Sequence, residues 1–198
     1  MTTIEGLQVP AGPRPRDMNA ENSWSEAALV DGCRAGRRDA LEALVSLYQE
    51  RLHRIAGAMA GADAAADLVQ ETFLAAVEAF PRFRGDAQLS TWLISILRNR
   101  FSLYLRGRKK WRLARLPEEG NRLPAPEPEK VETEVRDVLD RVRELPEEFR
   151  TPLVLFHVDG LSYAEIAKAM DCPVGTVRSR LFEARDRLKR LILKADAP

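Results

Sequence analysis

The clearest pattern of apolar and polar positions lies in the last third of the chain, between residues 161 and 190. Ser162, followed three residues later by Glu165, has the spacing of a capping box, so a short helix is expected to begin there. Pro173 suits the first turn of a second helix. The apolar residues of that helix recur at helical spacing: Val177, Leu181, Ala184, Leu188 and Leu191. The pattern predicts a helix-turn-helix.

The remaining surface of this second helix is basic. Its positive residues are Arg178, Arg180, Arg185, Arg187, Lys189 and Arg190. A helix-turn-helix places the N-terminal part of its second helix in the major groove of DNA. The residues expected to contact DNA are Val174, Thr176, Val177, Arg178, Ser179, Arg180 and Arg185. The alternative interpretation is a charged amphipathic hairpin with a solvated face.

Helical spacing continues through most of the chain, and no segment alternates with the two-residue period of a strand. We therefore expect an all-α protein. The other expected helices cover about 25–34, 39–60, 63–80, 90–105, 131–144 and 146–160, with Asp63 and Ser90 as N-caps. Prolines among acidic residues predict an extended linker near 117–129. The expected organisation is a flexible tail (1–22), a first helical domain (23–115), a linker (116–130) and a helix-turn-helix domain (131–194).

Charge is distributed unevenly along the 198 residues, although the formal net charge is only +1. Eight basic residues and no acidic ones lie between Arg98 and Arg115, whereas acids dominate between Glu118 and Glu148. This asymmetry favours a nucleic-acid partner for the basic segment. No apolar run is long enough to span a membrane. The N-terminus lacks the apolar core of a secretion signal, so we expect a cytoplasmic protein.

The longer stretch 86–115, which contains this basic segment, also carries aromatic residues, namely Trp92, Phe101, Tyr104 and Trp111. Aromatic faces that stack on unpaired bases, together with basic side chains along the phosphates, are typical of single-strand binding. The loop before this segment, Phe83–Asp86, could receive a base swung out of the duplex. The alternative is that the aromatic residues continue an apolar stripe and the loop only connects two helices.

Nothing in the sequence predicts catalysis. Cys33, Cys172, His53 and His157 do not have metal-ligand spacing, and both cysteines are expected to be packing residues without a disulfide. No nucleophile–base set, paired carboxylates in a pocket or phosphate-binding glycine loop is present. We therefore expect no enzyme activity, no cofactor and no metal.

Together, these motifs resemble the extracytoplasmic-function (ECF) group of bacterial RNA polymerase sigma factors. The matching segments are Asp67–Phe73, Phe83–Gly85, Thr91–Leu93, Ile96–Asn99, Gly160–Ala167 and Pro173–Arg180. The resemblance covers nearly everything from about Ser25 to Leu193. It departs from the family at Asp171–Cys172, where the turn often has a glycine and an aliphatic residue.

The resemblance implies core RNA polymerase and promoter DNA as partners, and an anti-sigma factor as a regulator. The β′ clamp helices would be bound through Asp67, Gln70, Glu71 and Phe73. The downstream promoter element, including a flipped base of the melted non-template strand, would be contacted by Phe83, Arg84, Gly85, Asp86, Arg98, Asn99, Arg100, Phe101, Tyr104 and Arg106. The second domain would read the double-stranded upstream element and bind the β flap, near Leu153–Val158 and Leu188–Leu193.

Two other functions fit parts of the pattern. A stand-alone helix-turn-helix regulator would have a similar C-terminal domain, but it has no need for the aromatic and basic segment. An enzyme acting on nucleic acid would need metal ligands or an acid–base pair, and the sequence has neither.

Overall fold

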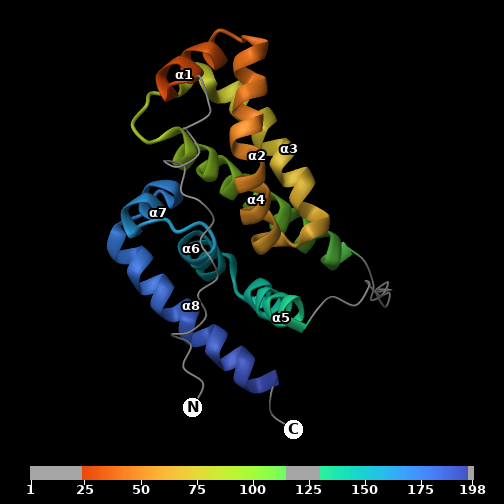
Figure 1. Cartoon of the computed structure of the whole chain (residues 1–198). Helices are drawn as coiled ribbons and strands as arrows, with labels where there is room; N and C mark the ends of the chain where they lie inside the picture. Colours follow the sequence, from red (N-terminus) through yellow and green to blue (C-terminus); the bar gives the residue numbers. More distant parts are fainter. Residues whose placement is uncertain (1–23, 115–129, 196–198) are drawn as a thin grey trace.

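The computed structural model describes residues 24–114 and 130–195, and within these stretches it contains helices and turns but no strands (Figure 1). The first bundle consists of α1 (Glu26–Arg34), α2 (Arg38–Ala60), α3 (Ala62–Ala79), the 3-10 turn η3 (Phe80–Arg82) and α4 (Leu89–Ala114). The second bundle consists of α5 (Lys130–Glu144), α6 (Glu147–His157), α7 (Tyr163–Met170) and α8 (Val174–Ala195). The all-α prediction is confirmed. The predicted tail and nearly all of the predicted linker lie outside the described residues.

Helix α2 is the central element of the first bundle, since α1, α3 and α4 all pack against it. Its apolar face, with Leu44, Leu52 and Ile55, is almost completely buried. Helix α1 crosses it closely at Gly32, where an added Cβ would lie 2.6 Å from the Cβ of Ala40. This close approach requires glycine.

The second bundle has the predicted helix-turn-helix. The side chain of Ser162 accepts a hydrogen bond from the Glu165 backbone N–H, and the Glu165 carboxylate accepts one from the Ser162 N–H, so the capping box is formed. Asp171 ends α7 in the left-handed region, with φ of 49°. Asp tolerates this conformation better than most residues do. The turn therefore forms without the glycine that the family often has there.

Two predicted N-caps are wrong. Helix α4 begins at Leu89, and the backbone N–H of Leu89 donates to the carboxylate of Glu26 at 3.1 Å, while Ser90 lies buried in the first turn. Helix α3 begins at Ala62 after Gly61, whose φ is 97°, and no side chain caps it. A carboxylate from α1 thus satisfies one of the backbone donors that a local cap would have served.

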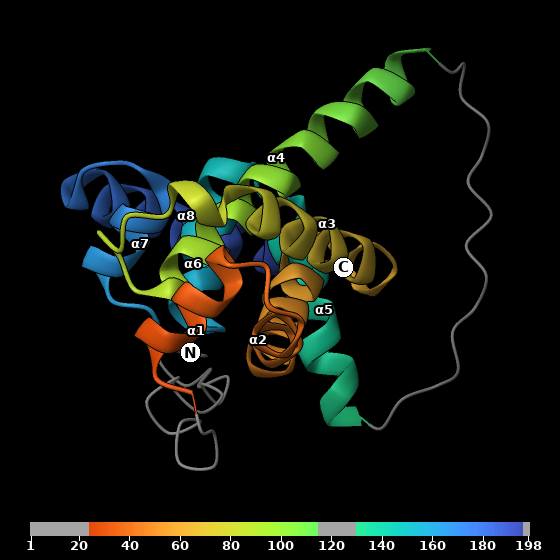
Figure 2. The same ribbon diagram turned by 90° about the horizontal axis from the view of Figure 1, so that it is seen from above.

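The two bundles are in contact with each other, which the spacing of apolar residues does not indicate. Helix α4 packs against α7, and α2 packs against α5 and α6. The C-terminal part of α4 stands away from both bundles in Figure 2. None of the helices in the described part of the chain is long and apolar enough to cross a membrane.

We predict that Ser162→Ala lowers the free energy of unfolding by about 1 kcal/mol, because it removes the capping-box acceptor at the start of α7. Urea denaturation followed by circular dichroism measures this change. Ser46→Ala is the matched control, since Ser46 is exposed within α2 and caps nothing. Equal stability of the two variants would contradict the role of the cap.

Candidate nucleic-acid interface

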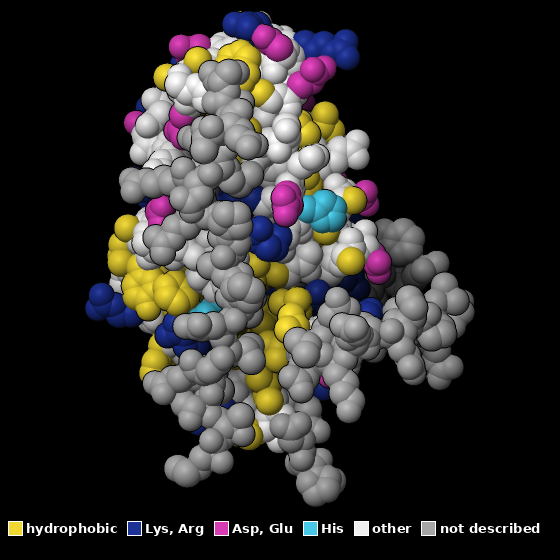
Figure 3. Space-filling model, viewed as in Figure 1, with side chains coloured by type: hydrophobic (Ala, Val, Ile, Leu, Met, Phe, Trp, Pro, Cys, Tyr) yellow, Lys and Arg dark blue, Asp and Glu magenta, His cyan; other side chains and the backbone are white. Residues whose placement is uncertain are grey.

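Helix α8 has two faces with different composition. Val177, Leu181 and Ala184 are at most 1% exposed and pack inward. The outward face carries Arg178, Ser179, Phe182 and Arg185, all of them exposed. In Figure 3, hydrophobic side chains lie beside basic ones over the region of α7 and α8. This outward face combines positive charge, a hydroxyl and an aromatic ring, which suits contact with DNA bases and phosphates.

The buried position of Val177 corrects the predicted DNA-contacting set. Val177 is 0% exposed because it packs in the core of the helix-turn-helix, so it cannot reach a base. Phe182, absent from that set, has 76% of its surface exposed. The helical spacing places Phe182 opposite the apolar stripe, and this signal was available in the sequence. Val174 is exposed, while Thr176 and Arg180 are half-exposed.

Arg185 is oriented by an aromatic group. Its guanidinium lies 5.4 Å from the ring centre of Phe156, and His157 contacts the same ring edge-on at 5.0 Å. Burial lowers the pKa of His157, and the positive charge of Arg185 lowers this pKa further. The imidazole is therefore neutral at neutral pH, and it adds no positive charge next to Arg185.

Two arginines of α8 are instead bound by acidic residues of the same helix. Arg187 pairs with Glu183 at 2.8 Å, and Arg190 pairs with Asp186 at 2.5 Å. Surface pairs of this kind contribute little to stability. They do neutralise these two arginines, so the arginines of α8 that form no ion pair with a described residue are Arg178, Arg180 and Arg185.

The loop between η3 and α4 is fixed at its start. Phe83 is 7% exposed and packs against Trp92, with ring centres 4.6 Å apart, and the Arg34 guanidinium donates to the Phe83 carbonyl. Arg84, Gly85 and Asp86 are exposed, and Gly85 has φ of 79°. Phe83 is thus an anchor, and it is removed from the expected base-contacting set. The exposed residues of the loop tip, Arg84, Gly85 and Asp86, stay in that set.

The residues of α4 that were predicted to contact DNA differ in how exposed they are. Asn99 and Arg106 are exposed, whereas the following are half-exposed: Arg98, Arg100 and Tyr104. Phe101 is 0% exposed, and the guanidinium of Arg150 from α6 lies 5.4 Å from its ring centre. Phe101 cannot stack on a base in this arrangement. The Arg108 guanidinium lies 5.7 Å from the Tyr104 ring, where α4 extends beyond the bundle.

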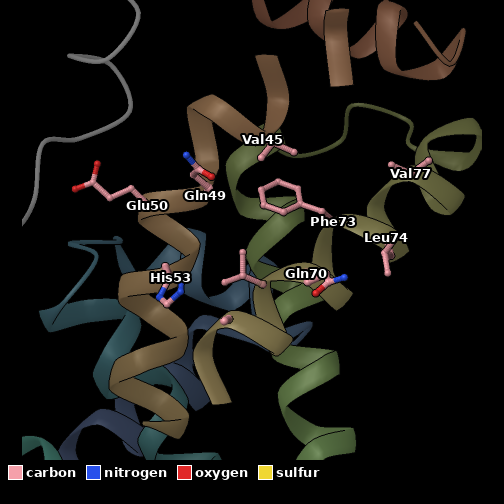
Figure 4. Close-up of a pocket in the computed structure, with 10 residues that line it drawn as sticks. Val45, Gln49, Glu50, His53, Gln70, Phe73, Leu74 and Val77 are labelled. Carbon is pink, nitrogen blue, oxygen red and sulfur yellow. The ribbon is translucent and has the colours of Figure 1, made fainter. Parts of the chain in front are cut away.

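A groove of about 760 Å³ runs between α2 and α3 (Figure 4). Two of the four predicted polymerase-contacting residues, Gln70 and Phe73, line it, and the Phe73 ring lies between the two helices. Leu74 and Val77 are 60% and 44% exposed at its edge, and neither was predicted. Exposed apolar patches of this kind are typical of interaction surfaces.

The other two predicted residues, Asp67 and Glu71, are exposed on α3 but do not line the groove. Among the described residues, neither of them forms an ion pair. Both carboxylates are therefore exposed and form no ion pair with another described residue.

Both parts of the chain match models of one protein class. Residues 44–111 match sigma-70 region 2, and residues 136–188 match sigma-70 region 4. The first segment contains most of α2, all of α3, the loop and most of α4. The second contains the helix-turn-helix. The class is that of RNA polymerase sigma factors, which direct promoter recognition.

The family within this class follows from whole-chain similarity. The chain is 35% identical over 180 residues to the ECF RNA polymerase sigma-E factor of Haemophilus influenzae, covering 85% of this chain and 95% of that protein. It is 37% identical over 174 residues to the sigma-E factor of Escherichia coli K12, covering 82% and 91%. The chain belongs to the ECF sigma factors. Its function is to direct promoter recognition by RNA polymerase, and the stand-alone regulator is not favoured.

Solved structures of sigma factors share the fold. CnrH, solved in complex with the cytosolic domain of CnrY, has a TM-score of 0.65 and 26% identity, covering 87% of this chain and 99% of that chain. RpoE of Bartonella quintana, solved with the anti-sigma factor NepR, has a TM-score of 0.61 and 29% identity, covering 79% and 98%.

We predict that Phe83→Ala lowers the free energy of unfolding by about 3 kcal/mol, because it removes a buried ring from the cluster with Phe80 and Trp92. Thermal and urea denaturation of the purified variant measure the loss. Arg84→Ala, at the exposed tip next to it, is expected to leave stability unchanged. If Phe83→Ala were as stable as the wild type, Phe83 would not be an anchor.

Proposed function

We propose that the outward face of α8 reads the upstream promoter element. The observation that carries this assignment is the separation of the two faces of α8, since the residues that hold the helix in place are not those that face outward. Arg178 and Arg185 are placed for guanine edges or phosphates. Phe182 offers an apolar surface for a thymine methyl group. Thr176, Ser179, Arg180 and Val174 complete the proposed contact set.

We propose that the downstream element is bound by the loop tip and by α4. Arg84, Gly85 and Asp86 form a short exposed loop between two anchored ends, which suits capture of an unstacked base. The residues of α4 proposed to follow the DNA are Arg98, Asn99, Arg100, Tyr104 and Arg106. Phosphate contacts from these arginines supply affinity that falls with salt.

The groove between α2 and α3 is the proposed docking site for the β′ clamp helices of the polymerase. Phe73 and Gln70 would contact the docked helices directly. Leu74 and Val77 extend the apolar contact, and Asp67 and Glu71, exposed elsewhere on α3, would add negative charge to the docking surface. Apolar contact at the centre with charges at the rim is the usual arrangement of protein interfaces. A second contact, between the helix-turn-helix and the β flap, is proposed for Leu153–Val158 and Leu188–Leu193.

Each DNA-binding surface is small, so each is expected to bind weakly by itself. Joining two weak sites in one complex raises the effective concentration of the second site after the first has bound. The polymerase would fix the distance between them. The chain would work in the cytoplasm without catalysing a reaction itself, because RNA synthesis belongs to the polymerase. An anti-sigma factor is the proposed regulator, as for the relatives solved with such partners.

Reconstituted transcription tests this function. Core RNA polymerase with the purified chain should initiate at the promoters that the chain directs, and neither component should do so alone. A stand-alone regulator would instead bind duplex DNA specifically without polymerase. Such binding, with no effect of the chain on initiation by core polymerase, would overturn the proposal.

We predict that Arg178→Ala weakens use of the upstream element by about tenfold, because a guanidinium contact with a base or phosphate is lost. Promoter binding by the reconstituted holoenzyme measures the effect, and core polymerase binding should be unchanged. Arg38→Ala is the matched control, since Arg38 is an exposed arginine on α2 in the first bundle. Undiminished promoter binding by Arg178→Ala would exclude Arg178 from the contact set.

We predict that the double substitution Asp67→Lys and Glu71→Lys weakens binding to core polymerase by roughly tenfold, because it reverses the charge that the exposed part of α3 presents to a partner. Co-elution with core enzyme and a competition titration measure the change. The control is Asp137→Lys with Glu144→Lys, which makes the same change in net charge on α5. An equal loss in both double variants would show a general charge effect and contradict the docking site.

A further inference from the structure

The aromatic ring of Phe156 is held in place by its surroundings at the side of the helix-turn-helix. Phe156 belongs to α6, is half-buried and packs against the hydrophobic core. The ring of Tyr163, from the first turn of α7, lies 5.4 Å away between ring centres, and the His157 ring contacts Phe156 edge-on at 5.0 Å. Aromatic pairs at these distances attract each other. The core and two neighbouring rings therefore fix the Phe156 ring.

The guanidinium of Arg185 lies over this ring. Helix α8 packs against α6, and Arg185 follows the buried residues Leu181 and Ala184, at the edge of the apolar face of α8. The central carbon of the guanidinium is 5.4 Å from the centre of the Phe156 ring. At this distance the electron-rich face of the ring attracts the cation. The contact restricts Arg185 to a small part of the volume that a long exposed side chain otherwise samples.

An aromatic partner leaves the hydrogen-bonding groups of Arg185 available. A guanidinium has five N–H donors, and its attraction to a ring acts on the positive charge without occupying them all. An acidic partner occupies such donors, as in the pairs Arg187–Glu183 and Arg190–Asp186 on the same helix. Asp186 directly follows Arg185 in the sequence, yet it binds Arg190. Among the described residues, Arg185 forms no ion pair and donates no hydrogen bond.

The position of Arg185 along α8 indicates which part of the DNA it would meet. Bases are read by the N-terminal part of a recognition helix. Arg185 lies eleven residues after Val174, the first residue of α8, which is about 16 Å further along the helix axis. A side chain at that distance is suited to the phosphates at the edge of the groove. The two free oxygens of a phosphate match the paired N–H groups of a guanidinium.

We propose that Phe156 is a positioning residue for promoter recognition, which fixes the Arg185 guanidinium, with its donors available, for a phosphate of the upstream element. The inference deepens the proposed function and rests on it, since it takes the outward face of α8 as the DNA-binding surface. A side chain that is ordered before binding loses less conformational entropy when the contact forms. Phe156 therefore raises the affinity for DNA through Arg185.

A double-mutant cycle with the reconstituted holoenzyme tests this role, on a promoter that the wild-type holoenzyme selects from a randomised duplex library. We expect Arg185→Ala to weaken promoter binding about tenfold and to lower its salt dependence by about one phosphate contact. Phe156→Leu should weaken binding about threefold in the wild-type chain. It should cause no further loss in Arg185→Ala, because its effect passes through Arg185. Phe156→Tyr keeps the ring and should bind like the wild type.

The control cycle pairs Phe156→Leu with Arg178→Ala, whose losses should be additive because Arg178 lies about two turns before Arg185 on α8. Phe156 also belongs to the segment proposed to bind the β flap, and a loss of that contact would weaken binding equally with and without Arg185. Such an equal loss would overturn the positioning role and leave α8 as the DNA-binding helix. If Arg178→Ala and Arg185→Ala both bound the promoter like the wild type, the proposed function of α8 would fall, and the positioning role with it.

Nuclear magnetic resonance of the full-length wild-type chain tests the contact without any change to Phe156. Protons held over the face of an aromatic ring resonate upfield of their usual position. The side-chain signals of Arg185 are identified as those missing from the spectrum of Arg185→Lys. We expect them upfield of the corresponding signals of Arg38, an exposed arginine that pairs with Glu42. Equal shifts for the two arginines would overturn the proposal.

Discussion

The relation between the two halves of this sigma factor depends on one buried ion pair, Arg51 with Asp159. An exposed pair such as Arg38 with Glu42 contributes about 0–1 kcal/mol, because water screens it. Removing one partner of a buried pair costs about 3–5 kcal/mol, because the other charge is left without water and without a counter-ion. Among the ion pairs of the described residues, Arg51–Asp159 is the one in which both side chains are buried. It specifies one way of placing the second bundle on the first.

Local patterns predicted the helices well where one face packs within its own bundle. The inward residues of α8 were identified from their spacing, and the capping box at Ser162 was identified from two residues. The N-cap of α4 could not be predicted in this way, because its first N–H is bound by Glu26, which lies 63 positions earlier in the chain. Helix-capping preferences depend on residues that are close in sequence, whereas Glu26 comes close to Leu89 only in the folded chain.

The candidate sites were predictable as segments but less so as individual side chains. Val177 and Phe83 lie in the expected segments, yet both are buried by their own bundle. Phe101 is covered by Arg150 of the other bundle, which no single-helix pattern can indicate. One signal did point to the contact: Arg51 falls on the apolar stripe of α2, seven residues after Leu44 and four before Ile55. A charge at such a position needs a partner, but its spacing does not say which one.

The two faces of α8 also bear on how members of such a family diverge. Val177, Leu181 and Ala184 are buried and hold the helix in place, whereas Arg178 and Phe182 are exposed on its outward face. Substitutions at the outward positions therefore leave the fold almost untouched. A duplicated gene can acquire a new set of target promoters through a few such changes, without an intermediate that fails to fold.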